Sequence, residues 1–249
     1  KAGQSGHLHL SLTTNGGNAF HDPSADDGIA ATMLHFIGGQ QMYMAELTAL
    51  VAPTVNSYRR LIPDLWAPTD ATWGIDNRTC AIRALPGNPD SQRIEYRVPG
   101  ADANPYLVAA AAIASGLHGV AHEITPEEAI VGNAYDREHP ENLRLPKTLT
   151  DAGTRLATSG IAREWFGNAF VDHFAASRDW EQAMMVRTTV KVEPAGPEAE
   201  MRTFDEPRWS AMSKWRRLRP STRLVRRSAN WTCSDRSVAS PEAARLRTT

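Results

Sequence analysis

An unbroken alternation of polar and apolar residues from His7 to Leu12 constrains the fold of this chain more than any other feature. Successive side chains of an extended strand point to opposite faces, so His7, His9 and Ser11 share one face and three leucines share the other. The leucine face predicts burial against a core. The polar face can bind a metal and a phosphate together, although an ordinary edge strand with a wet face also fits these six residues alone.

A second strand of the same design is predicted at Arg93–Val98, where Arg93, Glu95 and Arg97 fall on one face. A carboxylate between two guanidinium groups is consistent with a metal ligand flanked by anion-binding arginines. For this segment alone, a solvated face with cross-strand ion pairs is the commoner explanation.

Three more arginines lie near these strands. Arg83 belongs to a short apolar run at 80–84, Arg78 just precedes that run, and Arg60 lies in a loop rich in proline and tryptophan. Because guanidinium groups bind oxyanions in pairs, this set of arginines indicates an anion site.

The length of 249 residues and the 41% hydrophobic content favour one large domain with a substantial core. The chain contains no run of about 18 apolar residues, so we predict no membrane span. The first residues do not resemble a signal peptide. Two cysteines, Cys80 and Cys233, fit a reducing compartment. We therefore expect a cytoplasmic location.

Residues 202–249 contain twelve Lys and Arg against four Asp and Glu, and they lack an apolar period. This composition predicts a mostly disordered tail. Its cations and its tryptophans suit single-stranded nucleic acid, but no groove-reading element accompanies them, so we do not expect a nucleic-acid partner.

The body of the chain has the mixed helix and strand signals of an α+β protein. The turn signal at 14–18 predicts a hairpin that returns at Ala19–Phe20. Asn104 suits a helix N-cap and Pro105 the first helical position. Helices are predicted at about 26–50 with an interruption at Gly38–Gly39, at 105–121, at 150–158 and at 161–185.

Four sequence motifs resemble the catalytic domain of the glutamine synthetase family and occur in that family's order and spacing. They are Gly3–Leu12, Asn56–Leu61, Asn77–Arg83, and Arg93–Arg97 running on to Leu107. The resemblance covers roughly residues 1–185. It implies an antiparallel sheet curved into a half-barrel with flanking helices.

The resemblance also implies domain boundaries. The catalytic domain would occupy 1–190, followed at 191–249 by a basic tail that is disordered or, after out-of-frame translation, non-native. The N-terminal β-grasp domain and the strands with most of the metal-binding glutamates would be absent. We therefore expect negligible ligase activity from residues 1–249 alone.

The matching positions imply roles in a reaction that uses ATP and Mg²⁺ or Mn²⁺. The roles are metal ligation by His7 and Glu95, nucleotide contact by His9, Ser11 and Arg93, glutamate contact by Gly3, Arg60 and Arg97, and stabilisation of the transferred phosphate by Arg78 and Arg83. In this family the terminal phosphoryl of ATP moves to the γ-carboxylate of glutamate, and an amine then displaces phosphate from the resulting γ-glutamyl phosphate. Fixed cations suit that step because negative charge builds on the moving group. The family's ring assemblies imply a homo-oligomer.

One departure concerns the amine. Where glutamine synthetases carry a glutamate that helps to bind and deprotonate ammonium, this chain has Trp66, which cannot accept a proton. Its indole can pack against the carbon skeleton of a larger amine or against its cationic end. The sequence therefore predicts an organic amine as acceptor, as in γ-glutamylpolyamine synthetases.

Three alternatives stay open at this point. The protein could be a true glutamine synthetase that uses ammonium, or a nucleotide-binding pseudoenzyme. A metal-dependent hydrolase of the amidohydrolase type also carries His-x-His on an early strand, but it requires parallel strands in βα repeats.

Overall fold

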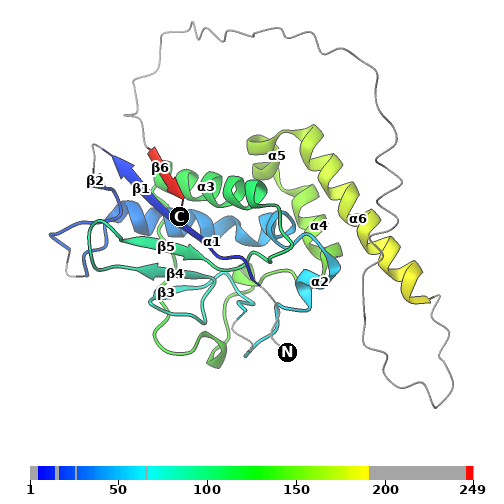
Figure 1. Ribbon diagram of the computed structural model, residues 1–249, viewed down its shortest axis with the longest axis horizontal. Coiled ribbons are helices and arrows are strands. Elements are labelled where there is room, and N and C mark those ends of the chain that lie inside the picture. The colour runs from blue at the N-terminus through cyan, green and yellow to red at the C-terminus, as the bar shows by residue number, and fades with distance from the viewer. Residues whose placement is uncertain (1–4, 15–16, 26, 65–66, 191–244, 249) are drawn as a thin grey trace, which may run out of the picture. The chain divides into compact units, whose positions relative to one another are not determined.

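The computed structural model describes residues 5–14, 17–25, 27–64, 67–190 and 245–248. Its sheet has the strand order β2 (Gly17–Asn18), β1 (Leu8–Thr14), β5 (Arg93–Tyr96), β4 (Ile82–Leu85) and β3 (Trp73–Ile75), as Figure 1 shows. A further strand, β6 (Arg245–Thr248), pairs with β1. The predicted α+β class with flanking helices is therefore confirmed.

One strand pair differs from the expected antiparallel sheet. β3 and β4 run parallel, whereas β1 pairs antiparallel with β2, β5 and β6, and β4 pairs antiparallel with β5. The short segment between β3 and β4 brings the chain back to the same end of the sheet, starting at Asp76 with φ of 49°. The antiparallel pairs are incompatible with the βα-repeated barrel that the hydrolase alternative requires.

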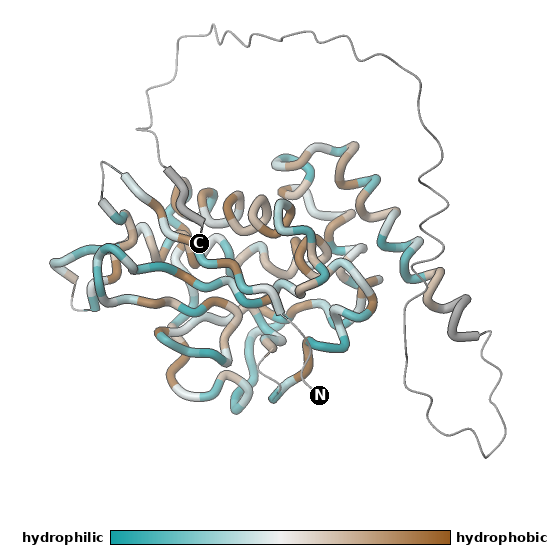
Figure 2. Tube along the Cα trace, in the orientation of Figure 1, coloured by the Kyte–Doolittle hydropathy of each residue, from teal (hydrophilic) through white to brown (hydrophobic). Residues whose placement is uncertain are grey.

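The strand register separates an apolar face from a polar one. Leu8 lies opposite Tyr96 and Leu10 lies opposite Ile94, so these side chains share a face. Leu10, Ile94 and Tyr96 are at most 1% exposed and belong to one core cluster with residues of the flanking helices. Figure 2 shows the corresponding alternation of hydropathy along the strands.

Two long helices form the centre of the core. These are α1 (Ala31–Val51) and α3 (Pro105–Ala121), the second with the predicted bounds and with Asn104 as its N-cap. The predicted interruption of the first helix at Gly38–Gly39 is wrong, because α1 continues through both glycines. A Cβ atom on Gly39 would lie 2.1 Å from the Ser115 carbonyl oxygen, so these glycines allow close contact with neighbouring backbone.

The remaining helices surround this core. The predicted helix at 150–158 is α4 (Leu149–Thr158), and the one predicted at 161–185 is two helices, α5 (Gly160–Phe166) and α6 (Asn168–Val190). They separate at Gly167, whose φ of 81° ends the first helix. The short helices are α2 (Val55–Tyr58), η1 (Ala134–Asp136) and η2 (Glu141–Leu143).

Two further expectations concern the chain's ends. The hairpin returns at Gly17–Asn18, two residues earlier than predicted, because Thr14 already pairs with Gly17. Residues 191–244 of the predicted tail lie outside the described residues, and Arg245–Thr248 form β6. Among the described residues, no helix is long and apolar enough to cross a membrane.

The close contact between α1 and α3 yields a prediction. Gly39→Ala would force a methyl group against the backbone of Ser115 and Gly119, and we expect it to lower the free energy of unfolding by about 2–3 kcal/mol or more. Chemical denaturation measures this loss. Gly160→Ala is the matched control, since its Cβ would meet nothing within 4 Å, and it should change stability by less than about 0.5 kcal/mol. Equal stability of the two variants would contradict the packing account.

Candidate active site

The polar faces of three neighbouring strands meet at Glu95. His9 lies opposite Glu95 across β1 and β5, and Arg83 lies opposite Glu95 across β4 and β5. Residues directly opposite in an antiparallel pair point to the same face. His7, which the pattern places on this face as well, lies with its Nδ1 2.5 Å from the Oε1 atom of Glu95. The structure therefore brings together the two segments that the sequence analysis singled out.

Glu95 is a buried carboxylate, 4% exposed, with cationic partners on both oxygens. Arg97 donates to Oε1 at 2.8 Å and Arg83 donates to Oε2 at 3.0 Å. Burial alone would raise the pKa of Glu95, but the hydrogen bond from Arg83 and the charge of Arg97 outweigh it and lower the pKa. The carboxylate is thus held ionised, as a metal ligand must be.

His7 has the protonation state that metal ligation requires. Burial and the charge of Arg97 lower its pKa, so the imidazole is neutral near pH 7. Its Nε2 lies 3.0 Å from the Ser5 hydroxyl. His7 and Glu95 together supply a nitrogen and a carboxylate donor that fit a divalent cation. The described part of the chain contains no group of three or more His, Cys, Asp or Glu residues placed to hold a metal.

A hollow of about 390 Å³ opens beside the β1–β5 pair, lined in part by the three predicted nucleotide contacts, His9, Ser11 and Arg93. Arg93 donates from Nε to the Nδ1 atom of His9 at 3.2 Å. Because His9 Nδ1 is the acceptor, the neutral ring carries its proton on Nε2 and can donate there. Burial lowers the pKa of His9, which favours this neutral form. The site thus offers a guanidinium and an imidazole N–H to an anion.

The two arginines predicted to bind glutamate are both buried. Arg60 is 9% exposed and donates to the Val98 carbonyl oxygen, while Arg97 is 5% exposed and contacts Glu95. The Nε atom of Arg97 has no hydrogen-bond partner among the described residues. A buried donor without a partner is costly, so Arg97 retains capacity for a ligand.

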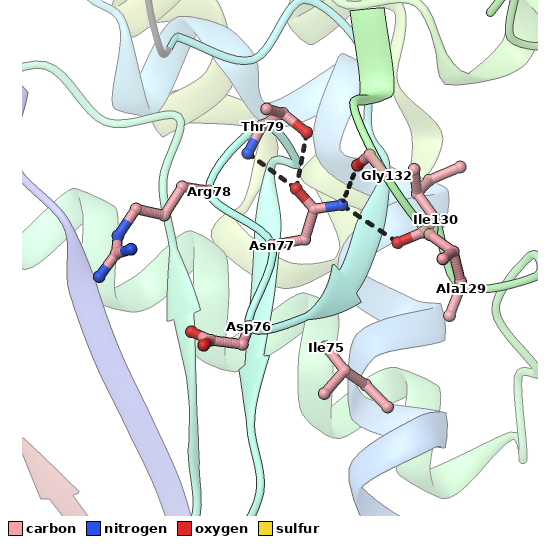
Figure 3. Close-up of a pocket in the computed structure, with 9 residues that line it drawn as sticks. Ile75, Asp76, Asn77, Arg78, Thr79, Ala129, Ile130 and Gly132 are labelled. Carbon is pink, nitrogen blue, oxygen red and sulfur yellow. Dashed lines mark hydrogen bonds between the residues drawn. The ribbon is translucent and has the colours of Figure 1, made fainter. Parts of the chain in front are cut away.

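The two arginines predicted to act on the phosphate are placed differently. Arg83 joins the Glu95 cluster and also pairs with Asp76. Arg78 lies exposed on the loop between β3 and β4, where it helps to line a hollow of about 420 Å³. In Figure 3 its side chain points away from Asn77. The described residues therefore bring Arg83, but not Arg78, into contact with Glu95.

Asn77 is a site residue that the sequence analysis did not single out for its own side chain. Its Nδ2 donates to the carbonyl oxygens of Ile130 and Gly132 at 3.1 and 2.8 Å, and its Oδ1 accepts from the backbone N–H and hydroxyl of Thr79 (Figure 3). Thr79 in turn accepts from the Ala134 N–H at 2.9 Å. This brace ties the Arg78 loop to residues 130–134.

Two predicted site residues, Gly3 and Trp66, lie outside the described residues. Two other histidines make contacts elsewhere, since His21 contacts Gln92 and His118 contacts the Tyr43 hydroxyl. Neither contacts the Glu95 cluster among the described residues.

The Asn77 brace yields a second prediction. Asn77→Asp keeps the shape but replaces the Nδ2 donor with an oxygen that faces two carbonyl oxygens. We expect a loss of about 2 kcal/mol in the free energy of unfolding, because two acceptors lose their donor. Thermal and chemical denaturation measure it. Asn133→Asp is the control, since within the described part of the chain that exposed amide donates to exposed Asp136 alone. A loss no larger than in the control would show that the amide does not brace the loop.

Comparison with known proteins identifies the family of this chain. The family model for the glutamine synthetase catalytic domain matches residues 1–222. Type-1 glutamine synthetase 2 of Dictyostelium discoideum is 41% identical over 184 residues, which cover 72% of this chain and 35% of that protein. A glutamate–isopropylamine ligase of a Pseudomonas species is 38% identical over 182 residues, which cover 72% of this chain and 39% of the relative.

Among solved structures, a GmaS/ADP complex (conformation 1) matches with a TM-score of 0.64 and 34% identity, covering 76% of this chain and 46% of that one. The chain thus spans less than half the length of these relatives. This family-model match covers most of the chain and shows that the chain belongs to the glutamine synthetase family through its catalytic domain.

Proposed function

We propose that the protein carrying this chain is an ATP-dependent carbon–nitrogen ligase that forms a γ-glutamyl amide by way of γ-glutamyl phosphate. The observation that carries the proposal is the buried Glu95 carboxylate, which meets His7 and two arginines on one sheet face. This face combines a pair of metal-binding groups with fixed cations. Phosphoryl transfer needs that combination, since charge builds on the moving group.

Each residue has a distinct part in this proposal. His7 and Glu95 would hold a divalent cation, Mg²⁺ or Mn²⁺, which neutralises phosphate charge when bound. His9, Ser11 and Arg93 would hold the nucleotide phosphates in the adjoining hollow. The ionic contacts of Arg83 fix its guanidinium beside Glu95, where it can stabilise the transferred phosphoryl group. Arg78, whose side chain is exposed, would join it at the transferred phosphoryl group.

The two buried arginines are the residues that we propose bind glutamate. Arg60 and Arg97 would hold the α-carboxylate, together with the backbone at Gly3. The Nε atom of Arg97, which has no hydrogen-bond partner in the described segments, supports this role, because a carboxylate would satisfy it. The γ-carboxylate would then point toward the cation and the phosphate.

The acceptor we propose is an organic amine larger than ammonium. Trp66 replaces a carboxylate that would bind ammonium, and relatives of this chain include a glutamate–isopropylamine ligase, a γ-glutamylethanolamide synthetase and a γ-glutamylputrescine synthetase. Glutamine synthetases are also among the relatives, so glutamate–ammonia ligation is the second candidate. We further propose a cytoplasmic homo-oligomeric ring for the complete protein, as its family membership implies.

An amine panel tests the acceptor. The complete protein is supplied with ATP, Mg²⁺, glutamate and either ammonium, alkylamines, diamines or aminoalcohols, and γ-glutamyl products are identified by mass spectrometry. We expect at least one organic amine to exceed ammonium in kcat/KM by about tenfold or more, equivalent to ~1.4 kcal/mol of transition-state binding. Turnover with ammonium far above every organic amine would favour the glutamine synthetase alternative. Tight nucleotide binding without turnover would indicate a pseudoenzyme.

The metal assignment yields a separate prediction. Glu95→Gln removes one proposed ligand charge while preserving size, and we expect it to weaken Mn²⁺ binding by about tenfold or more. Titration followed by electron paramagnetic resonance measures free Mn²⁺ directly. Glu141→Gln removes the same charge from an exposed turn and should bind Mn²⁺ like the wild type. Unchanged affinity in the Glu95 variant would refute its role as a ligand.

A further inference from the structure

A carboxylate outside the Glu95 cluster joins the two chain segments, just after α2 and just after β5, that carry Arg60 and Arg97. Asp102 lies between β5 and α3, two residues before the N-cap residue Asn104. Its Oδ2 atom accepts from the Thr54 hydroxyl at 2.6 Å and from the Ser57 hydroxyl at 2.8 Å. A single carboxylate oxygen therefore holds both members of the capping box of α2.

That capping box is directly linked to Arg60. Arg60 follows the four-residue helix, and its backbone N–H donates to the Ser57 carbonyl oxygen at 3.2 Å. A helix this short has little stability of its own, so its orientation depends on contacts at its ends. Holding Ser57 in place thus holds the backbone from which Arg60 extends.

The guanidinium end of Arg60 returns to the same segment that carries Asp102. It donates to the Val98 carbonyl oxygen, next to Arg97 in the chain. A Cβ atom on Gly100 would lie 2.2 Å from Asp102 Oδ1 and 3.9 Å from the NH2 atom of Arg60, so both side chains approach this glycine. Burial lowers the pKa of Arg60, and the charge of Asp102 acts in the opposite direction.

We propose that Asp102 is a positioning residue for the α-carboxylate of glutamate, because it fixes Arg60 relative to Arg97 through Thr54 and Ser57. The inference rests on the proposed function and deepens it. Asp102 has no contact with the Glu95 cluster among the described residues, so its effect should reach glutamate binding and leave nucleotide binding alone. Substituting a residue with a merely structural role would affect the binding of glutamate and of nucleotide alike.

The test uses steady-state kinetics of the complete protein with glutamate and ATP varied separately. Asp102→Asn should raise KM for glutamate about tenfold, since two hydrogen bonds to a charged acceptor are weakened, while KM for ATP and kcat stay within about twofold. Thr54→Val removes one of the two donors and should raise KM for glutamate about threefold. Thr54→Ser keeps the hydroxyl and should restore wild-type KM.

Two controls separate positioning from loss of stability. Asp172→Asn removes a carboxylate of α6 that pairs with Arg163 of α5, and it should leave both KM values unchanged. In an Arg60→Ala background, Asp102→Asn should raise KM for glutamate little further, because the effects of substituting residues that act through one another are not additive. Independent, additive effects of the two substitutions would overturn the proposal.

The remaining outcomes are also decisive. Unchanged KM for glutamate in both Asp102→Asn and Thr54→Val would overturn the role of Asp102 while leaving the ligase assignment intact. An equal rise in both KM values would show a general structural effect and would overturn it as well. If Asp102→Asn does not fold, Thr54→Val alone decides. A wild-type protein without glutamate-dependent ADP release would instead overturn the proposed function, and this inference with it.

Discussion

The polar face of this protein depends on the charge balance around one buried carboxylate. Glu95 is 4% exposed, and a buried ion without partners would cost several kcal/mol. The pairing of β1, β5 and β4 supplies those partners, because register places His9 and Arg83 directly opposite Glu95 and sets His7 and Arg97 beside it. A shift of one residue in either pair would send this carboxylate into the apolar core. The register of these strands therefore determines which groups surround Glu95.

The helices make this register possible by fixing the opposite face of the sheet. Glycines in α1 and α3 let the two helices approach at backbone distance, and the leucines of β1 complete the same core. The loops then add the arginines that the strands do not carry. Each is anchored by a small polar network, Asn77 and Thr79 for the Arg78 loop, and Asp102 with the α2 capping box for Arg60. The long arginine side chains thereby extend from short backbone segments that hydrogen bonds hold in place.

Much of this arrangement could be predicted from the sequence because its signals are local. Alternation in His7–Leu12 and Arg93–Val98 predicted the two strands and their polar faces, and Asn104-Pro105 predicted the start of α3. The unbroken α1 was missed because the helix-weakening tendency of Gly38 and Gly39 is outweighed by tertiary packing. Parallel pairing of β3 with β4 has no local signal, since it depends on the path of residues 76–81. Asn77 and Asp102 were missed as anchors because the two carbonyl oxygens that bind the Asn77 amide, and the two hydroxyls that bind Asp102, are distant in sequence.

A crystal structure of the complete protein with Mg²⁺ and ADP tests the central claim most directly. The account predicts that the diphosphate lies against the β1–β5 face, in contact with His9 and Arg93, and that the cation is bound by His7 and Glu95. Nucleotide bound in another hollow, such as the one between residues 75–79 and 129–132, would contradict it. So would a bound cation that leaves the contact between His7 and Glu95 untouched.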